Sequence, residues 1–208
     1  MHYDVIVYVL LIDFLAILSP GPDFFMVLKN SLTNSLRAGF FTTLGISIGS
    51  TVMFTLGIFG IGIIVASSKF LFTLVKVSGA LYLCYLALKS LFAKVYIKEP
   101  QLVYSNINTF KLKDKEFFKI GLICNLTNPK AFMFIVSLST YVNQHGNAFK
   151  DGIVIILGSF IATASWFILV SYIFGNIRVR SFFYKRQRII NIIFGILLLY
   201  VAFGIIFL

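Results

Sequence analysis

The chain has 208 residues, of which 59% are hydrophobic and 12% are charged, about half the charged share of a typical soluble domain. Its mean hydropathy is +0.96. This composition excludes an ordinary soluble globular domain, whose surface needs more polar side chains, and it excludes intrinsic disorder, which needs low hydrophobicity. A membrane-spanning helix takes about 20 apolar residues, so the chain has room for roughly six spans.

Six long apolar segments follow one another along the chain, at about 5–28, 38–66, 70–92, 116–140, 147–174 and 187–207. All are too long for strands, and none shows the alternation of a membrane β-barrel. Helices are therefore the remaining way to satisfy every backbone polar group in lipid. The sequence predicts an all-α polytopic membrane protein with six transmembrane helices.

The net charge is +11, from 18 basic and 7 acidic residues. In a soluble protein this charge would suggest nucleic acid. Here most basic residues lie between the apolar segments, where they attract lipid headgroups and set topology, so we expect a lipid bilayer and no nucleic acid as partner. Basic residues concentrate after the first, third and fifth segments, and only Lys69, Lys76 and Lys150 lie on the other side. The positive-inside rule places the odd loops in the cytoplasm and both termini outside.

A long polar stretch divides the chain into two halves of three spans each. We expect one integral-membrane domain, with a first three-helix repeat (1–95), a cytoplasmic linker (96–115) and a second three-helix repeat (116–208). Because three is odd, a second half with the same fold must run upside down relative to the first. The sequence thus predicts a 3+3 inverted-topology repeat, the plan of many secondary transporters.

The first span of each half contains a matching proline, because aligning the two spans places Pro22 on Pro129 and Asp23 on Lys130. Prolines remove backbone donors and interrupt helices. We therefore expect helices 1 and 4 to be broken, with the breaks lining a substrate site. The residues of the two breaks are Pro20, Gly21, Pro22, Asn125, Thr127, Asn128 and Pro129. The alternative is a simple proline kink between lipid-facing helices.

Asp23 and Lys130 are charged residues within spans, where an ionised side chain costs roughly 2.5–3.5 kcal/mol. A pseudo-two-fold axis would bring them near each other. The pair would then receive a zwitterion, with Asp23 facing an ammonium group and Lys130 facing a carboxylate. The half-helices that follow the prolines would direct their amide dipoles at the anionic group. The alternatives are snorkelling of Lys130 toward an interface and helix capping by Asp23.

Asp13 has no basic partner on its own helix and lies seven residues before Pro20, on a similar face. Burial disfavours the charged form of a carboxyl group. Asp13, together with Asp23, is therefore a candidate to gain and lose a proton during transport. The alternative is a structural, hydrogen-bonded aspartate.

Five segments resemble the LysE/RhtB family of amino-acid exporters: Ser19-Pro-Gly-Pro-Asp23, Lys29-Asn-Ser31, Arg37-Ala-Gly39, Gly45-Ile-Ser-Ile-Gly49 and Asn125-Leu-Thr-Asn-Pro-Lys130. The resemblance covers nearly the whole chain. It implies a bacterial inner-membrane secondary transporter that exports amino acids or close derivatives by proton antiport and alternating access. The family's motif residues correspond here to Pro20, Gly21, Pro22, Asp23, Asn128, Pro129 and Lys130.

Other functions have less support from the sequence. Export of another small solute, such as a metal cation, stays an alternative. However, the spans hold two scattered cysteines and no histidine, whereas metal sites favour clusters of such ligands, so we expect no metal and no cofactor. Ser47 has G-x-S-x-G spacing but no histidine partner, so we do not expect an enzyme. Gly45 and Gly49 form a GxxxG motif, which serves close packing within the bundle or a homodimer face.

Overall fold

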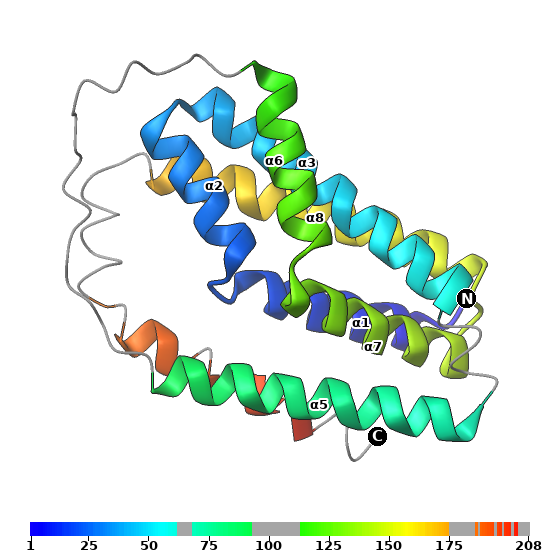
Figure 1. Ribbon diagram of the computed structural model, residues 1–208. Coiled ribbons are helices and arrows are strands. Elements are labelled where there is room, and N and C mark those ends of the chain that lie inside the picture. Colours follow the sequence, from blue (N-terminus) through cyan, green and yellow to red (C-terminus); the bar gives the residue numbers. More distant parts are fainter. Residues whose placement is uncertain are drawn as a thin grey trace.

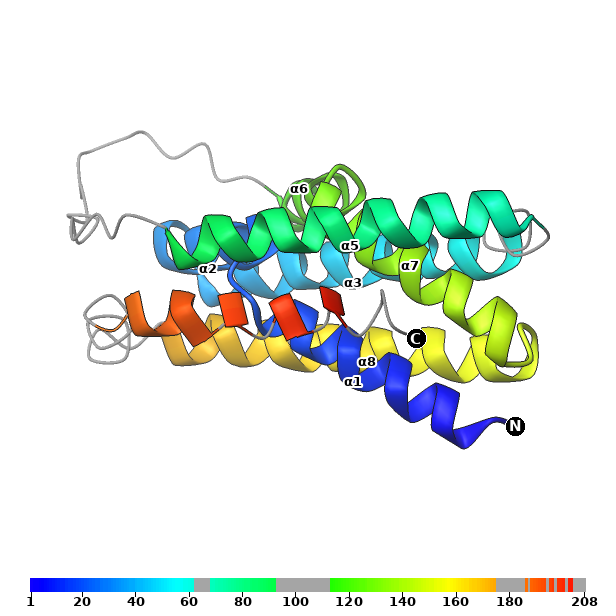
Figure 2. The same cartoon turned by 90° about the horizontal axis from the view of Figure 1, so that it is seen from below.

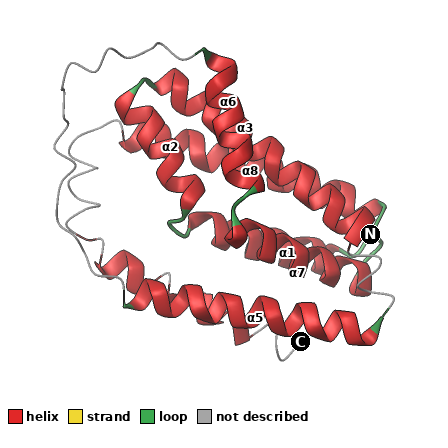
Figure 3. Cartoon of the chain, viewed as in Figure 1, coloured by secondary structure: helices red, strands yellow, loops and turns green. Residues whose placement is uncertain are grey.

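The computed structural model describes residues 1–61, 68–92, 113–174, 186, 188–193, 195–196, 198–200 and 202–203. Within these ranges the chain is helical apart from short connections, and it contains no strand (Figure 3). The helices in chain order are α1 (Tyr3–Leu18), α2 (Pro22–Thr33), α3 (Leu36–Leu56), the π-helix η1 (Gly57–Ile61), α5 (Lys69–Leu91), α6 (Asp114–Leu126), α7 (Pro129–His145) and α8 (Lys150–Phe174). The prediction of an all-α protein is confirmed for the described part of the chain.

Prolines break two spans at the expected places. α1 and α2 meet at a bend of 53°, and α6 and α7 at a bend of 61°. α2 begins at Pro22 after an extended Gly21, and α7 begins at Pro129 after Asn128, whose side chain accepts a hydrogen bond from the backbone N–H of Lys130. Proline suits the first position of a helix, because an N–H there has no partner within the helix. The predicted interruption of these two helices is confirmed.

Length and composition identify the helices that can cross a membrane. Leu36–Gly60 and Lys150–Ile173 qualify as continuous helices, and each bent pair can act as one further span, which makes up to four among the described residues. α5 has 23 residues, but its apolar part, Val77–Leu91, is shorter. The linker 96–115 lies largely, and the expected sixth span 187–207 partly, outside the described residues. This architecture is that of a polytopic membrane protein.

The two broken spans begin on opposite sides of the bundle. Figures 1 and 2 show the N-terminus, the end of α7 and the starts of α5 and α8 on one side, which we call the N-terminal side. The ends of α2, α5 and α8 lie toward the opposite side. The first broken span therefore starts, with α1, on the N-terminal side, and the second broken span ends, with α7, on that same side.

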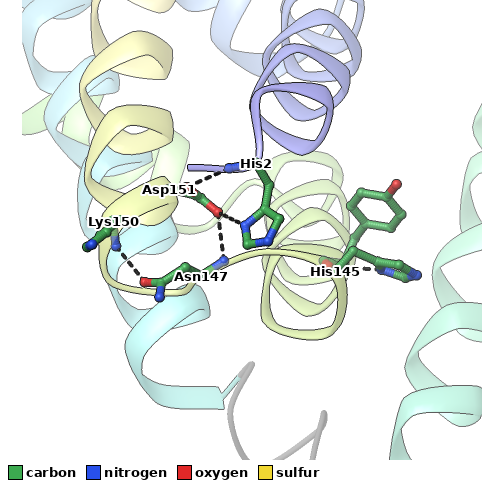
Figure 4. A network of polar contacts seen from close by, with 6 residues as sticks. His2, His145, Asn147, Lys150 and Asp151 are labelled. Atoms are coloured by element: carbon green, nitrogen blue, oxygen red, sulfur yellow. Dashed lines mark hydrogen bonds and ion pairs between the residues drawn. The ribbon is translucent and has the colours of Figure 1, made fainter.

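Polar contacts fix the helix ends on both sides of the bundle. On the N-terminal side, the fully buried carboxylate of Asp151, in the first turn of α8, accepts hydrogen bonds from the backbone N–H groups of His2 and Asn147 at 3.2 and 2.6 Å. The Nδ1 atom of His2 lies 2.8 Å from the same carboxylate (Figure 4). On the opposite side, Arg37 at the start of α3 donates to Asp114 at the start of α6, at 2.7 Å. The contacts of His2 with Asp151 and of Arg37 with Asp114 each join the first half of the chain to the second.

Glycines let α3 and α6 cross at very short range. A Cβ atom at Gly45 would collide with the backbone of Phe118, and one at Gly121 would collide with the backbone of Thr42. Gly49, one turn further along α3, also faces α6. Small residues permit such close approach between membrane helices. The GxxxG motif therefore packs within one chain and is not free to form a homodimer face.

Two buried apolar clusters lie on either side of the first break. The larger cluster includes Ala16 of α1 together with residues of α7 and α8. The smaller cluster joins Phe24 of α2 to Ile46 of α3 and Phe167 of α8. Large apolar side chains such as Leu157 of α8 are exposed on the outer surface, where lipid would cover them. The polar residues of the break therefore lie between two regions of apolar packing.

Candidate functional site

The two helix breaks meet through side chains from both halves of the chain. Asp23, in the first turn of α2, is only 9% exposed. Its Oδ2 atom accepts hydrogen bonds from the amides of Asn125 and Asn128, each at 3.0 Å. Asn125 lies in the last turn of α6 and Asn128 caps α7, so both donors flank the second break. The carboxylate of the first break is thus held by the amides of the second.

Lys130 makes the reciprocal contact. Its Nζ atom donates a hydrogen bond to the backbone carbonyl of Ser19 at 2.8 Å. This carbonyl lies beyond the end of α1, where no further helical turn can use it. No ion pair joins Asp23 directly to Lys130, because each charge is bonded to neutral groups of the opposite break. The expected proximity of the two residues is present, and neutral hydrogen-bonding groups take the place of a direct pair.

Both charged residues line a small cavity, which we call the acidic cavity because Asp13 and Asp23 both line it. Its volume is about 40 Å³, enough for water but small for any organic solute. Three buried polar atoms of its lining residues have no hydrogen-bond partner: Asp23 Oδ1, Asn125 Oδ1 and Thr163 Oγ1. An unsatisfied buried polar atom costs about 1–3 kcal/mol, so such atoms mark where a polar ligand or water can bind.

Asp13 reaches the acidic cavity from α1 and is 4% exposed. Its Oδ2 atom accepts a hydrogen bond from the hydroxyl of Ser159 on α8 at 2.7 Å. Ser159 and Thr163 are buried one turn apart, on the side of α8 opposite the exposed Leu157 and Ile161. Neither hydroxyl residue was predicted from the sequence. The signal that could have found them is the stripe of polar residues at a spacing of four in an otherwise apolar helix.

A second, wider cavity of about 470 Å³ lies on the other side of the breaks. Residues of α5 and of the described C-terminal positions form its far wall, including Tyr82 and Asn191. We call it the wide cavity. Four residues line both cavities, namely Ser19, Gly21, Asn128 and Lys130. The breaks therefore form a partition with one cavity on each face.

The predicted site residues divide between the two cavities. Asp13, Asp23 and Asn125 line only the acidic cavity. Pro20, Pro22 and Pro129 line only the wide cavity. Gly21, Asn128 and Lys130 line both.

Two further residues lie away from these cavities. Thr127 is exposed and lines neither, and its hydroxyl donates to the backbone carbonyl of Ile123 at 2.7 Å. Ser47, the centre of the G-x-S-x-G sequence, is fully buried and donates to the carbonyl of Thr43 at 3.0 Å. That hydroxyl is therefore bonded to its own helix backbone. The site thus brings together two opposite charges, amides and hydroxyls at the meeting of the two breaks.

Comparisons with known proteins agree with this picture. The family model of the LysE type translocator matches residues 14–207. The uncharacterized membrane protein YrhP of Bacillus subtilis is 31% identical over 196 residues, covering 91% of each chain. The threonine efflux protein of Escherichia coli K12 is 29% identical over 199 residues, covering 95% of this chain and 94% of the relative, and that of Salmonella typhi is equally similar. No solved structure matches the chain. The chain therefore belongs to the LysE type translocator family and is a membrane transporter, not an enzyme.

Proposed function

We propose that this protein exports an amino acid across the bacterial inner membrane, by alternating access and in exchange for protons. The observation that carries the proposal is the meeting of Asp23 and Lys130 at two helix breaks, in one buried cavity with unpartnered oxygen atoms. The relatives that are named threonine efflux proteins support an amino acid as the transported solute. A metal cation is not favoured as the solute, because these relatives are named for an amino acid.

The groups around the acidic cavity complement both ends of a zwitterion. Asp23 Oδ1 and Asn125 Oδ1 are free to accept hydrogen bonds from the ammonium group of the solute. The ammonium group of Lys130 donates to the solute carboxylate, and the first turn of α7 adds its dipole. Each charged end of the solute thereby exchanges its water for a charge-assisted bond, which offsets its desolvation.

Transport in this proposal requires the cavity to open. A volume of about 40 Å³ is far below the roughly 300–1,000 Å³ of ordinary ligand pockets. In our proposal the two halves form an inverted-topology repeat, and they rock against each other so that the breaks separate and then close again around the solute. The opposite starting sides of α1 and α6 support this arrangement. The basic residues near the ends of α2 and α5 support a cytoplasmic location for that side and an external location for both termini.

The direct test uses the purified protein in liposomes with a pH gradient across the membrane. Labelled threonine and a panel of other neutral and basic amino acids are supplied on one side, and their movement is followed over time. We expect at least one amino acid to accumulate against its own gradient and to stop accumulating when the pH gradient is dissipated. Failure of the whole panel to move would contradict the proposed substrate class.

We propose that Asp13 carries the exchanged proton. Replacing Asp13 by asparagine retains the size of the side chain and an acceptor for the Ser159 hydroxyl, but the group can no longer bind and release a proton. The variant is therefore expected to lose accumulation driven by the pH gradient, while exchange of labelled for unlabelled amino acid persists. The Ser159→Ala variant keeps the carboxyl group and should retain accumulation. If liposomes with the Asp13→Asn variant still accumulate amino acid when the pH gradient is applied, Asp13 does not carry the exchanged proton.

A further inference from the structure

The wide cavity has the size and position of an access route to the breaks. Its volume of about 470 Å³ falls within the range of ligand pockets, in contrast to the acidic cavity. It extends from Ser19 at the first break to Lys89 and Ser90, which lie in the last turn of α5. The end of α5 lies on the side of the bundle opposite the N-terminus (Figure 1). The cavity therefore reaches from the partition between the two cavities toward that side.

The charged residues that line the wide cavity have one sign within the described part of the chain. Lys89 and Lys130 both line it, and none of its described lining residues is acidic. Lys89 is exposed and lines the cavity, and its Nζ atom lies 5.9 Å from the centre of the Tyr85 ring. The two aspartates of the site, Asp13 and Asp23, line only the other cavity. The wide cavity therefore attracts anionic groups, whereas the acidic cavity attracts cationic ones.

We infer that the wide cavity is the cytoplasmic access route for the amino acid, and that Lys89 captures the carboxylate of the solute and directs it to Lys130. This inference rests on the proposed export of amino acids. Lys130 borders both cavities, so the carboxylate keeps one basic partner while the ammonium end passes through the partition to Asp23. Phe25 and Tyr82 also line the route, and their rings contact the side chain of the passing solute.

The kinetic test of this inference measures uptake into inside-out membrane vesicles, in which the cytoplasmic face of the protein is turned to the medium. The Lys89→Gln variant is expected to raise KM about fivefold with little change in maximal rate, because a charge near the route acts on capture rather than on the moving step. Lys89→Arg should restore the KM of the unmodified protein. Lys69→Gln is the matched control, since Lys69 is exposed at the other end of α5 and lines neither cavity.

Varying the ionic strength in the same uptake experiment gives a second test of the role of Lys89. The difference in KM between the unmodified protein and Lys89→Gln should shrink as ionic strength rises, because salt screens an exposed charge. An unchanged KM in Lys89→Gln, or an equal rise in Lys69→Gln, would overturn the role of Lys89.

Accessibility of α5 tests the route independently of Lys89. In a protein with Cys84 and Cys124 replaced by alanine, Tyr82→Cys is treated with a charged, membrane-impermeant thiol reagent. We expect rapid labelling in inside-out vesicles and slower labelling when a transported amino acid is present. Leu81→Cys is the control, because Leu81 is 63% exposed on the outer surface of α5, where lipid keeps a thiol from ionising and reacting.

The outcomes separate this inference from the proposed function. If the unmodified protein moves no amino acid, the proposed function fails and the inference fails with it. If transport is present but Tyr82→Cys is labelled only from the external face, or not at all, the inference alone fails. If Tyr82→Cys is labelled from the cytoplasmic face but no transported amino acid slows the labelling, this cavity is likewise excluded as the route of the solute.

Discussion

The Asp23→Asn variant is expected to lose transport by about a hundredfold in kcat/KM, without loss of folded protein. Removal of one partner from a buried charged hydrogen-bonded contact costs about 2–5 kcal/mol, and 1.4 kcal/mol corresponds to a factor of ten. Asparagine keeps an oxygen that can accept from Asn125 and Asn128, so the contact between the breaks survives. The charge that we propose to hold the solute ammonium group is lost. Lys130→Gln should cause a loss of similar size, because it removes the charge that we propose to hold the carboxylate.

Matched controls lie on the same broken spans. Asp4→Asn removes a carboxylate from the exposed first turn of α1, and Lys119→Gln removes an exposed ammonium group from α6. Both should transport at the rate of the unmodified protein in the same liposome assay, at equal amounts of reconstituted protein. Activity within about threefold of the unmodified protein in Asp23→Asn or Lys130→Gln would mean that the charges do not hold the solute, since threefold is well under 1 kcal/mol.

The Gly45→Ala variant is expected to lower the melting temperature of the purified protein by roughly 5–10 °C. An added methyl group at this position collides with the backbone of Phe118, which cannot turn away as a side chain could. Gly121→Ala should have a similar effect, because its methyl group meets the backbone of Thr42. Either change forces α3 and α6 apart. Since α6 carries Asn125 to the site, transport should fall together with stability.

Gly60→Ala is the control that distinguishes the steric collision between α3 and α6 from a general effect of replacing glycine by alanine. Gly60 lies in η1, directly after α3, and a Cβ atom there has no neighbour within 4 Å. Alanine is the better helix former by about 1 kcal/mol, so this variant should melt at the same or a slightly higher temperature. Thermal unfolding followed by size-exclusion chromatography in detergent measures all three variants. A Gly45→Ala protein as stable as Gly60→Ala would contradict the backbone contact between α3 and α6.

The helix breaks were predictable because proline acts locally. Pro22 and Pro129 cannot continue a helix that already exists, whatever surrounds them, so each had to begin a new one. The alignment of Asp23 with Lys130 also indicated that the two residues belong to one region. Both conclusions depend only on the identity and spacing of residues along the chain. They could therefore be reached before the structure, which agrees with them.

The partners of these residues were not predictable, because they depend on how helices from distant parts of the chain face each other. Asp23 is held by two asparagine amides and not by Lys130. Thr127, though part of the second break, turns outward and bonds its own helix. Ser159 contacts Asp13 from a helix 146 residues further along the chain. Such contacts follow from rotation of each helix about its axis, which apolar composition alone leaves undetermined in a membrane span.

The central claim is that two interrupted helices join to hold a zwitterion between Asp23 and Lys130. A high-resolution structure of the protein in a lipid nanodisc with a transported amino acid bound tests it most directly. We expect the solute ammonium group within hydrogen-bonding distance of Asp23 Oδ1 and the solute carboxylate against Lys130 Nζ. Solute density elsewhere in the bundle, with both side chains contacting only protein or lipid, would contradict it.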